Sequence, residues 1–241
     1  EREKSLVDLL IVYLESQLSA EYFINEKSQF IKIIELLKSW SDDLQIIYAI
    51  RQQKNKHSQV NQLAQMFLQR IQQFDDCILI PNGLISAKQN NQNEHISLAI
   101  LKRHGQKIDW IQIDPGSAYH QRFQALQGLT SNAYLEIKDI NLQEFNQEWL
   151  SLLIGLKAID PKGYYKDVSL YECLLAHLNG ITSFKSTLDE AFIPYTHTSP
   201  IHTWQVLEQT LAYLLDNFGC ENPIKLHGNL VLGFKQFLLS E

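Results

Sequence analysis

His95 and Asp114 are the two residues whose types and spacing best suit chemistry in this sequence. They stand at the ends of the stretch 95–114, in which two β-rich runs flank the dipeptide His104–Gly105. Glycine readily adopts the positive φ angle that a tight two-residue turn requires, so the stretch is predicted to form a β-hairpin. An imidazole beside a carboxylate is the base and the orienting acid of a nucleophilic hydrolase site.

The expected register of this hairpin brings the two groups together. With the turn centred on the 104–105 dipeptide, Lys102 faces Lys107 and His95 faces Asp114. Residues directly opposite each other in an antiparallel ladder share a face, with Cβ atoms about 4.5–5.5 Å apart. The alternatives are a purely structural polar pair, or another register, because a slip by one residue moves every side chain to the other face.

The elements that must position the hairpin are mostly helices. The spacing of apolar residues predicts helices near 5–22, 26–39, 42–53, 58–74, 141–157, 167–179, 202–218 and 223–239. Gly219 is the expected stop of the helix 202–218. Met66, on the apolar face of 58–74, and Trp110 are expected in the core.

Two further strands are expected beside the hairpin. One covers 77–80 and ends at Pro81-Asn82-Gly83, and the other covers 134–138. Residues 86–94 are expected to form a polar loop, and 181–201 to be irregular. The predicted fold class is α+β, with a small antiparallel sheet between an N-terminal helical region, 1–74, and C-terminal helices. Residues 75–241 form the second domain, unless the whole chain is one continuous domain.

Composition excludes several classes of protein. The 241 residues are 45% hydrophobic, which supports a sizeable core, and the net charge of −6 with scattered basic residues argues against a nucleic-acid partner. No apolar run reaches the roughly 18 residues of a membrane span. Three cysteines without a CxxC pattern predict a reducing compartment such as the cytoplasm. The sequence begins without methionine, as expected of a fragment.

Four short motifs resemble the papain-like cysteine peptidases and related effector proteins of intracellular bacteria. One group of these proteins has a strand followed by Pro-Gly-Gly, a Gly-His-Ala-like strand, a strand ending in Asn-Thr-Gly, and a helix opened by Ser-Gly-x-Cys-x-Trp. The corresponding segments here are Ile-Pro-Asn-Gly at 80–83, Glu-His-Ile-Ser at 94–97, Ile-Asp-Pro-Gly-Ser at 113–117 and Thr-Ser-Pro-Ile-His-Thr-Trp at 198–204. The resemblance covers roughly 77–218.

The resemblance implies a role for each matching residue. His95 would be the base, Asp114 the orienting acid, and His202 occupies the place of the nucleophilic cysteine. An imidazole cannot replace a thiolate in acyl transfer, so the domain is degenerate, the alignment is displaced, or another residue attacks. Ser199 lies near that place and is the alternative nucleophile.

The cysteines themselves are weak candidates. Cys77 is expected in a buried strand and Cys173 in the middle of a helix. Cys220 follows a helix C-terminus, where the dipole disfavours a thiolate.

Metal and cofactor sites are not expected. His197, His202, Cys220 and His227 are ligand types that zinc accepts, but their spacing matches no common zinc pattern. The sequence has neither GxxxxGK nor GxGxxG, the glycine motifs that bind phosphates.

Two functions remain open. The first is a papain-like peptidase or acyl-transfer effector domain that acts on a protein target, active or catalytically degenerate, and that is secreted into a host cell if the resemblance extends so far. The second is a non-enzymatic helical module that binds a partner protein. A reactive side chain within hydrogen-bond reach of His95 and Asp114 would favour the enzyme, and exposed apolar helix surface would favour the module.

Overall fold

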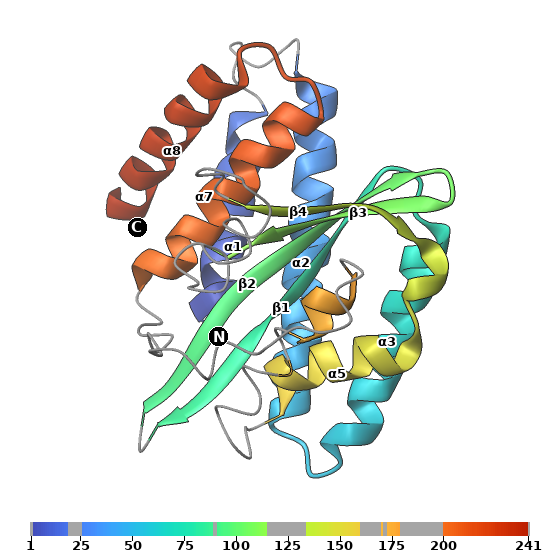
Figure 1. Ribbon diagram of the computed structural model, residues 1–241. Helices are drawn as coiled ribbons and strands as arrows, with labels where there is room; N and C mark the ends of the chain where they lie inside the picture. The colour runs from blue at the N-terminus through green and yellow to red at the C-terminus, as the bar shows by residue number, and fades with distance from the viewer. Residues whose placement is uncertain are drawn as a thin grey trace, which may run out of the picture.

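The computed structural model describes residues 2–18, 26–88, 91–114, 134–159, 170, 173–178 and 200–240, without the side chains of 85–88, 91–95 and 200–202. A four-stranded antiparallel sheet in the order β1-β2-β3-β4 forms its centre (Figure 1). The strands are β1 (Cys77–Lys88), β2 (Asn91–His104), β3 (Lys107–Ile113) and β4 (Leu135–Asn141). The helices around it are α1 (Arg2–Gln17), α2 (Lys27–Arg51), α3 (Lys56–Gln73), the 3₁₀ turn η2 (Leu142–Glu144), α5 (Gln147–Ala158), α7 (Pro200–Asn217) and α8 (Pro223–Ser240).

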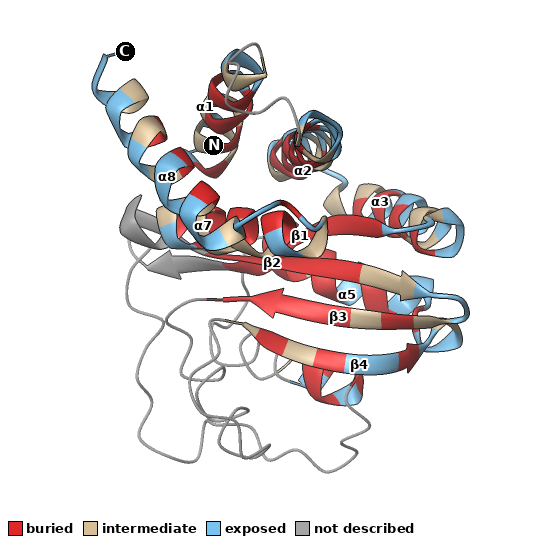
Figure 2. Ribbon diagram, turned by 90° about the horizontal axis from the view of Figure 1, so that it is seen from above, coloured by how far each residue is buried: buried red, intermediate tan, exposed pale blue. Residues whose placement is uncertain are grey.

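Helices cover both faces of the sheet, so the predicted α+β class with flanking helices is confirmed. Side chains of β1, β2 and β3 alternate between two apolar clusters, and most of the central strand positions are buried. The α5-side core combines one face of the sheet with α3 and α5. The α7-side core combines the other face with α1, α7 and α8. Helix α2 lies beyond the β1 edge and contributes to both cores (Figure 2).

The two cores use residues from both sides of position 74. Ile71 of α3 belongs to the α5-side core with Trp110, and Leu14 of α1 belongs to the α7-side core with Leu98. Both Trp110 and Leu98 lie in the sheet. The division into 1–74 and 75–241 stays a prediction. The two layers of helices on either side of the sheet do not correspond to these two segments.

The predicted helices 26–39 and 42–53 are one helix, α2, which is a correction to the sequence-based expectation. Two polar residues between or at the ends of the predicted helices have partners on other helices. Ser41 is buried and its hydroxyl donates a hydrogen bond to Asp8 of α1, while Asp43 is paired with Arg70 of α3 at 2.7 Å. Trp40, directly before Ser41, is fully buried, so the helix continues through the segment.

Strand β1 continues through Pro81 to Lys88, although the strand was predicted to end at residue 80. Proline is tolerated here because β1 is an edge strand, and Gly83 adopts a φ of 117°. Beyond it, β1 and β2 pair as far as Lys88 and Asn91. The predicted loop 86–94 was therefore wrong for the described backbone, which forms the end of a long hairpin.

The other predicted elements have mixed outcomes. The helices 58–74, 202–218 and 223–239 and the strand 134–138 correspond to α3, α7, α8 and β4, and Gly219 has the left-handed φ of 67° expected after α7. Trp110 is buried as predicted, but Met66 is 47% exposed, so its placement in the core was wrong. Within the predicted helix 167–179, residues 173–178 are helical; 181–199 lie outside the described residues.

Candidate functional site

The register of β2 and β3 differs from the prediction by two residues. His104 pairs with Lys107, and Lys102 therefore pairs with Asp109 and not with Lys107. The two turn residues are Gly105 and Gln106, and Gly105 has a φ of +64° at the first central position, as a type II′ turn requires. The predicted centre of the turn at 104–105 was one residue too early along the chain.

This register changes the partner of Asp114. The last pair of the ladder joins Leu98 to Ile113, so the next step along both strands brings Ser97 opposite Asp114. The backbone of His95 pairs with Leu84 of β1 on its other side. The prediction that His95 directly faces Asp114 was therefore wrong. Because the shift is an even number of residues, it leaves the alternation of faces unchanged.

The four predicted catalytic residues are described to different extents. Asp114 is fully described and is buried, with 1% of its surface exposed at the end of β3. His95 lies in β2 and His202 in the first turn of α7, but both side chains are outside the described part of the chain. Ser199 lies outside the described residues. Their assembly into one site stays a prediction.

Three polar side chains form an amide cluster near the same end of the sheet: Asn82 of β1, Ser97 of β2 and Gln112 of β3. The Asn82 amide donates to Gln112 Oε1 at 3.2 Å, and the Gln112 amide donates back to Asn82 Oδ1 at 3.1 Å. The Ser97 hydroxyl also donates to Asn82 Oδ1, and Trp110 Nε1 donates to Gln112 Oε1 at 3.0 Å. All four residues are buried.

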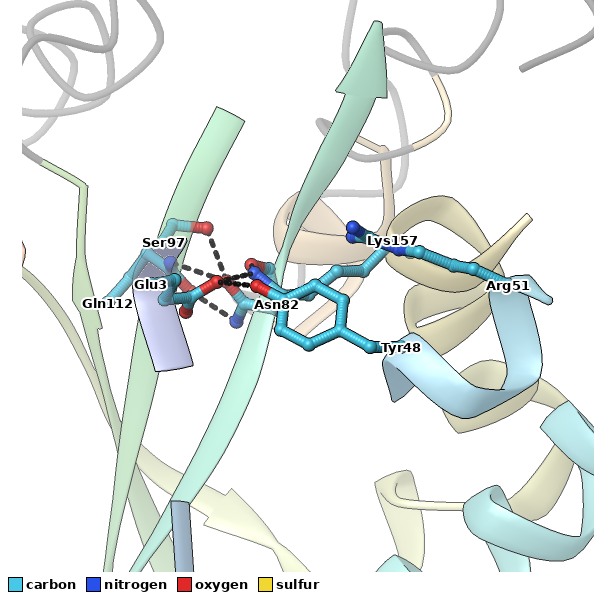
Figure 3. A network of polar contacts seen from close by, with 7 residues as sticks. All are labelled: Glu3, Tyr48, Arg51, Asn82, Ser97, Gln112 and Lys157. Carbon is cyan, nitrogen blue, oxygen red and sulfur yellow. Dashed lines mark hydrogen bonds and ion pairs between the residues drawn. The ribbon is translucent and has the colours of Figure 1, made fainter. Parts of the chain in front are cut away.

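A buried ion pair lies next to the amide cluster (Figure 3). Lys157 of α5 donates from Nζ to Glu3 Oε2 of α1 and to the main-chain oxygen of Asn82, both at 2.9 Å. Both charged side chains are 0% exposed. Tyr48 of α2 donates its hydroxyl to the same Glu3 oxygen at 3.2 Å, and Arg51 donates to the Lys157 carbonyl at 2.7 Å. Residues from α1, α2, α5 and β1 thus meet at one point.

The polar residues of the amide cluster and the ion pair serve to hold the fold together. Buried polar groups are stable only when they are hydrogen-bonded, and buried charges only when they are paired as well. Lys157 is paired with Glu3, and the Asn82 side chain is hydrogen-bonded through both its oxygen and its nitrogen. Together they fix the end of the sheet from which Asp114 and the His95 backbone extend.

Two of the three described thiols, Cys77 and Cys220, are poorly suited to act as nucleophiles. Burial, helped by Asp76, raises the pKa of Cys77 to about 12, and burial raises that of Cys220 to about 11. Because the thiolate is the nucleophile, these raised pKa values disfavour both cysteines as nucleophiles near neutral pH. Cys173 is exposed in the helical segment 173–178.

An imidazole–carboxylate pair lies at the turn end of the β2–β3 hairpin. His104 Nε2 is 3.0 Å from Asp109 Oδ2, and Asp109 Oδ1 accepts a hydrogen bond from the main-chain N–H of Asp139 at 3.0 Å. Asp139 has a φ of 57° where the β3–β4 ladder is irregular. His104 is half exposed, and it is Asp109 that is hydrogen-bonded to the irregular part of the β3–β4 ladder.

Two of the four residues considered for zinc have described side chains. Cys220 is buried, and His227 Nε2 lies 3.0 Å from the main-chain oxygen of Glu208. His197 and the side chain of His202 are outside the described part. Among the described residues, no group of three or more histidine, cysteine or acidic side chains is placed to hold a metal ion.

Comparisons with known proteins leave the fold and site as the only guides to function. No protein-family model, no curated protein and no solved structure matches the chain. None of the described helices has both the length and the apolar character needed to cross a membrane.

Sequence reasoning missed the amide cluster and the Glu3–Lys157 pair. The available signal was a polar residue inside an apolar run: Lys157 follows Leu-Leu-Ile-Gly-Leu, and Ser97 lies within Ile-Ser-Leu-Ala-Ile. Such residues are expected to be buried with a partner. The partners come from distant segments, and no local pattern identifies Glu3 as the partner of Lys157.

Proposed function

We propose that the protein is a catalytically degenerate domain of papain-like ancestry that acts by binding a protein partner and not by acyl transfer. The observation that carries this proposal is the state of the possible nucleophiles. Position 202, at the start of α7, is histidine, and burial raises the pKa of both Cys77 and Cys220.

The arrangement of elements supports the papain-like ancestry. Strands β1, β2 and β3 occur in the chain order of the resembled motifs, and the helix α7 follows them and packs on the sheet through the α7-side core. In a thiol hydrolase the nucleophile gains from a helix N-terminus, because unpaired N–H groups and the dipole lower the pKa of a thiol there. In this chain, the first turn of α7 carries His202 and no cysteine.

The proposal predicts that the full chain does not turn over peptide or ubiquitin-type substrates. Thiol-directed active-site probes should label it no faster than they label an ordinary surface cysteine, and only at the exposed Cys173. The measurement is intact-mass labelling over time, combined with a fluorogenic hydrolysis assay on the same preparation. The proposal would be overturned in favour of an active hydrolase if the wild-type chain turns over a substrate and either His95→Ala or Ser199→Ala, still folded, loses that turnover.

The proposed binding of a protein partner makes a separate prediction. A partner that is held by docking, without chemistry at the imidazole, should be retained equally by the wild-type chain and by His95→Ala. Rapid stoichiometric labelling at Cys77 or Cys220 in the folded chain would contradict the proposal, because it would mean that one of these thiols is activated.

A further inference from the structure

The outer face of α8 exposes large aliphatic side chains. Ile224, Leu232 and Leu239 are 86%, 59% and 89% exposed, and Val231 beside Leu232 is half-buried. Among the described residues, these three include the two most exposed large hydrophobic side chains of the chain. An isolated exposed leucine needs no explanation, but a row of them on one helix marks a contact surface.

The helix geometry aligns these residues. At about 1.5 Å and 100° per residue, Ile224, Leu232 and Leu239 lie within an arc of about 80° along a line of about 22 Å. The opposite side of α8 is buried through Leu226 and Phe234. Figure 2 shows α8 at the outside of the molecule, with pale blue exposed residues on the side that faces away from the sheet.

The charge of α8 differs from that of the whole chain. Helix α8 contains Lys225 and Lys235 and no acidic residue in its 18 positions, whereas the chain carries a net charge of −6. Lys225 is exposed beside the aliphatic row. Lys235 is also exposed and starts within the row, and its Nζ lies 5.2 Å from the centre of the Trp204 ring of α7. The outer face of α8 is therefore apolar and basic, and it fits an anionic surface.

We propose that the outer face of α8 (Ile224, Val231, Leu232, Lys235 and Leu239, with Lys225 beside it) binds the surface of an anionic lipid bilayer. Aliphatic side chains next to lysines, along a straight helix, are the pattern of helices that lie in the membrane–water interface. This inference concerns a peripheral contact, which requires no membrane-spanning helix, and it goes beyond the proposed function.

Two other occupants fit this face less well. The centres of protein–protein interfaces are enriched in Tyr, Trp and Arg and depleted in Lys, whereas this face has lysine and no exposed aromatic side chain. A second copy of α8 would bring no acidic residue to pair with Lys225 and Lys235. A lipid headgroup layer supplies both the negative charge and the apolar boundary.

The test uses the full chain and sedimentation with two vesicle compositions, phosphatidylcholine alone and phosphatidylcholine with about 30% phosphatidylserine. Binding is expected to the phosphatidylserine vesicles, to weaken with added salt, and to be much weaker on phosphatidylcholine alone. The variant Leu232→Ser/Leu239→Ser should bind at least about tenfold more weakly than the wild type, because two inserted side chains are lost. Lys225→Glu should also weaken binding.

Matched controls separate this face from general surface effects. Met66→Ser/Leu152→Ser removes two exposed apolar side chains from α3 and α5, and Lys54→Glu reverses an exposed charge far along the chain; both should bind as the wild type does. Circular dichroism checks that each variant is folded. The proposal is overturned if phosphatidylserine vesicles do not retain the wild-type chain, or if the two leucine substitutions leave binding unchanged. A concentration-dependent dimer that these substitutions abolish would also overturn it, by assigning the face to a second copy.

Discussion

The Glu3–Lys157 pair illustrates how a buried charge acts on stability. Both side chains are 0% exposed, so each lost its hydration on folding and depends on the other. The attraction within such a pair is largely offset by the cost of desolvation, and the net contribution of the intact pair is small. Removal of one partner has a large effect, because the remaining charge is buried without compensation.

The substitution Lys157→Met should therefore destabilise the protein by about 3–5 kcal/mol in urea unfolding. The double variant Glu3→Gln/Lys157→Met should recover much of this loss, since no lone charge remains. The matched control is Lys4→Met, which removes the partly exposed Lys4–Asp8 pair and should cost at most about 1 kcal/mol. A loss below 1 kcal/mol for Lys157→Met would mean that the pair is not buried as described.

Asp43 gives a prediction of pH dependence. Burial raises its pKa to about 6 and outweighs the opposing effect of Arg70. An unfolded aspartate has a pKa of about 3.9, so between pH 4 and 6 the folded state binds more protons than the unfolded state. The contribution of Asp43 to stability is thus present at low pH and is lost as the pH rises to about 6.

The free energy of unfolding of the wild type, relative to Asp43→Asn, should fall by about 2 kcal/mol between pH 4 and pH 6. Urea unfolding at a series of pH values measures this difference. The control is Asp75→Asn, at an exposed aspartate that does not act on the pKa of Asp43, and it should leave this pH dependence unchanged. A difference that rises over this range would contradict the assigned pKa direction.

Some residues of the fold could be predicted individually and others could not. Gly219 and Trp110 were predicted correctly because a left-handed helix stop and a strand tryptophan are set by local chemistry. Met66 was placed in the core by periodicity, but it lies at the border of the apolar face of α3 and is half exposed. The pairing of Lys157 depends on a contact with α1, which no local pattern encodes.

At the scale of elements, tertiary contacts decided the boundaries that the sequence left ambiguous. Helix α2 continues through Ser41 and Asp43 because α1 and α3 supply partners for those polar groups. Strand β1 continues through Pro81 because an edge strand has no hydrogen bond to lose on its outer side. The hairpin was predicted, but its turn was placed one residue early, and that error displaced the expected partner of Asp114.

The contact between α1 and α8 gives a prediction for one glycine. A Cβ atom at Gly233 would lie 2.1 Å from the hydroxyl oxygen of Tyr13, whose ring packs on Phe234 at 5.5 Å. Gly233→Ala should therefore destabilise the protein by about 1–3 kcal/mol, and Tyr13→Phe should partly relieve the loss.

The matched control for Gly233 is Gly228, five residues earlier in the same helix, where an added Cβ meets nothing within 4 Å. Gly228→Ala should stabilise α8 by about 0.5–1 kcal/mol through helix propensity. Thermal unfolding of the two variants compares them directly. Equal effects of the two substitutions would contradict the close packing of α8 on α1.

At the scale of the whole molecule, one sheet joins the two layers of helices. Both cores include side chains from 1–74, and α2 contributes to each of them. Loss of α1, α2 and α3 would expose apolar surface on both faces of the sheet, so the strands depend on these helices for burial.

Residues 75–241 expressed alone should therefore fail to form a cooperatively folded domain. Circular dichroism and denaturant unfolding of this fragment, compared with the full chain, measure the outcome. A sharp unfolding transition in the fragment would support the division at residue 74 and contradict the shared cores.

The proposed papain-like ancestry, with no nucleophile at the start of α7, is tested most directly by placing a thiol at position 202. If the first turn of α7 is the former nucleophile site and His95 its base, His202→Cys should be alkylated near neutral pH at least tenfold faster than Cys173 in the same chain. Addition of His95→Ala should return that rate to the level of Cys173. A cysteine at 202 that reacts no faster than Cys173, with or without His95, would contradict the account.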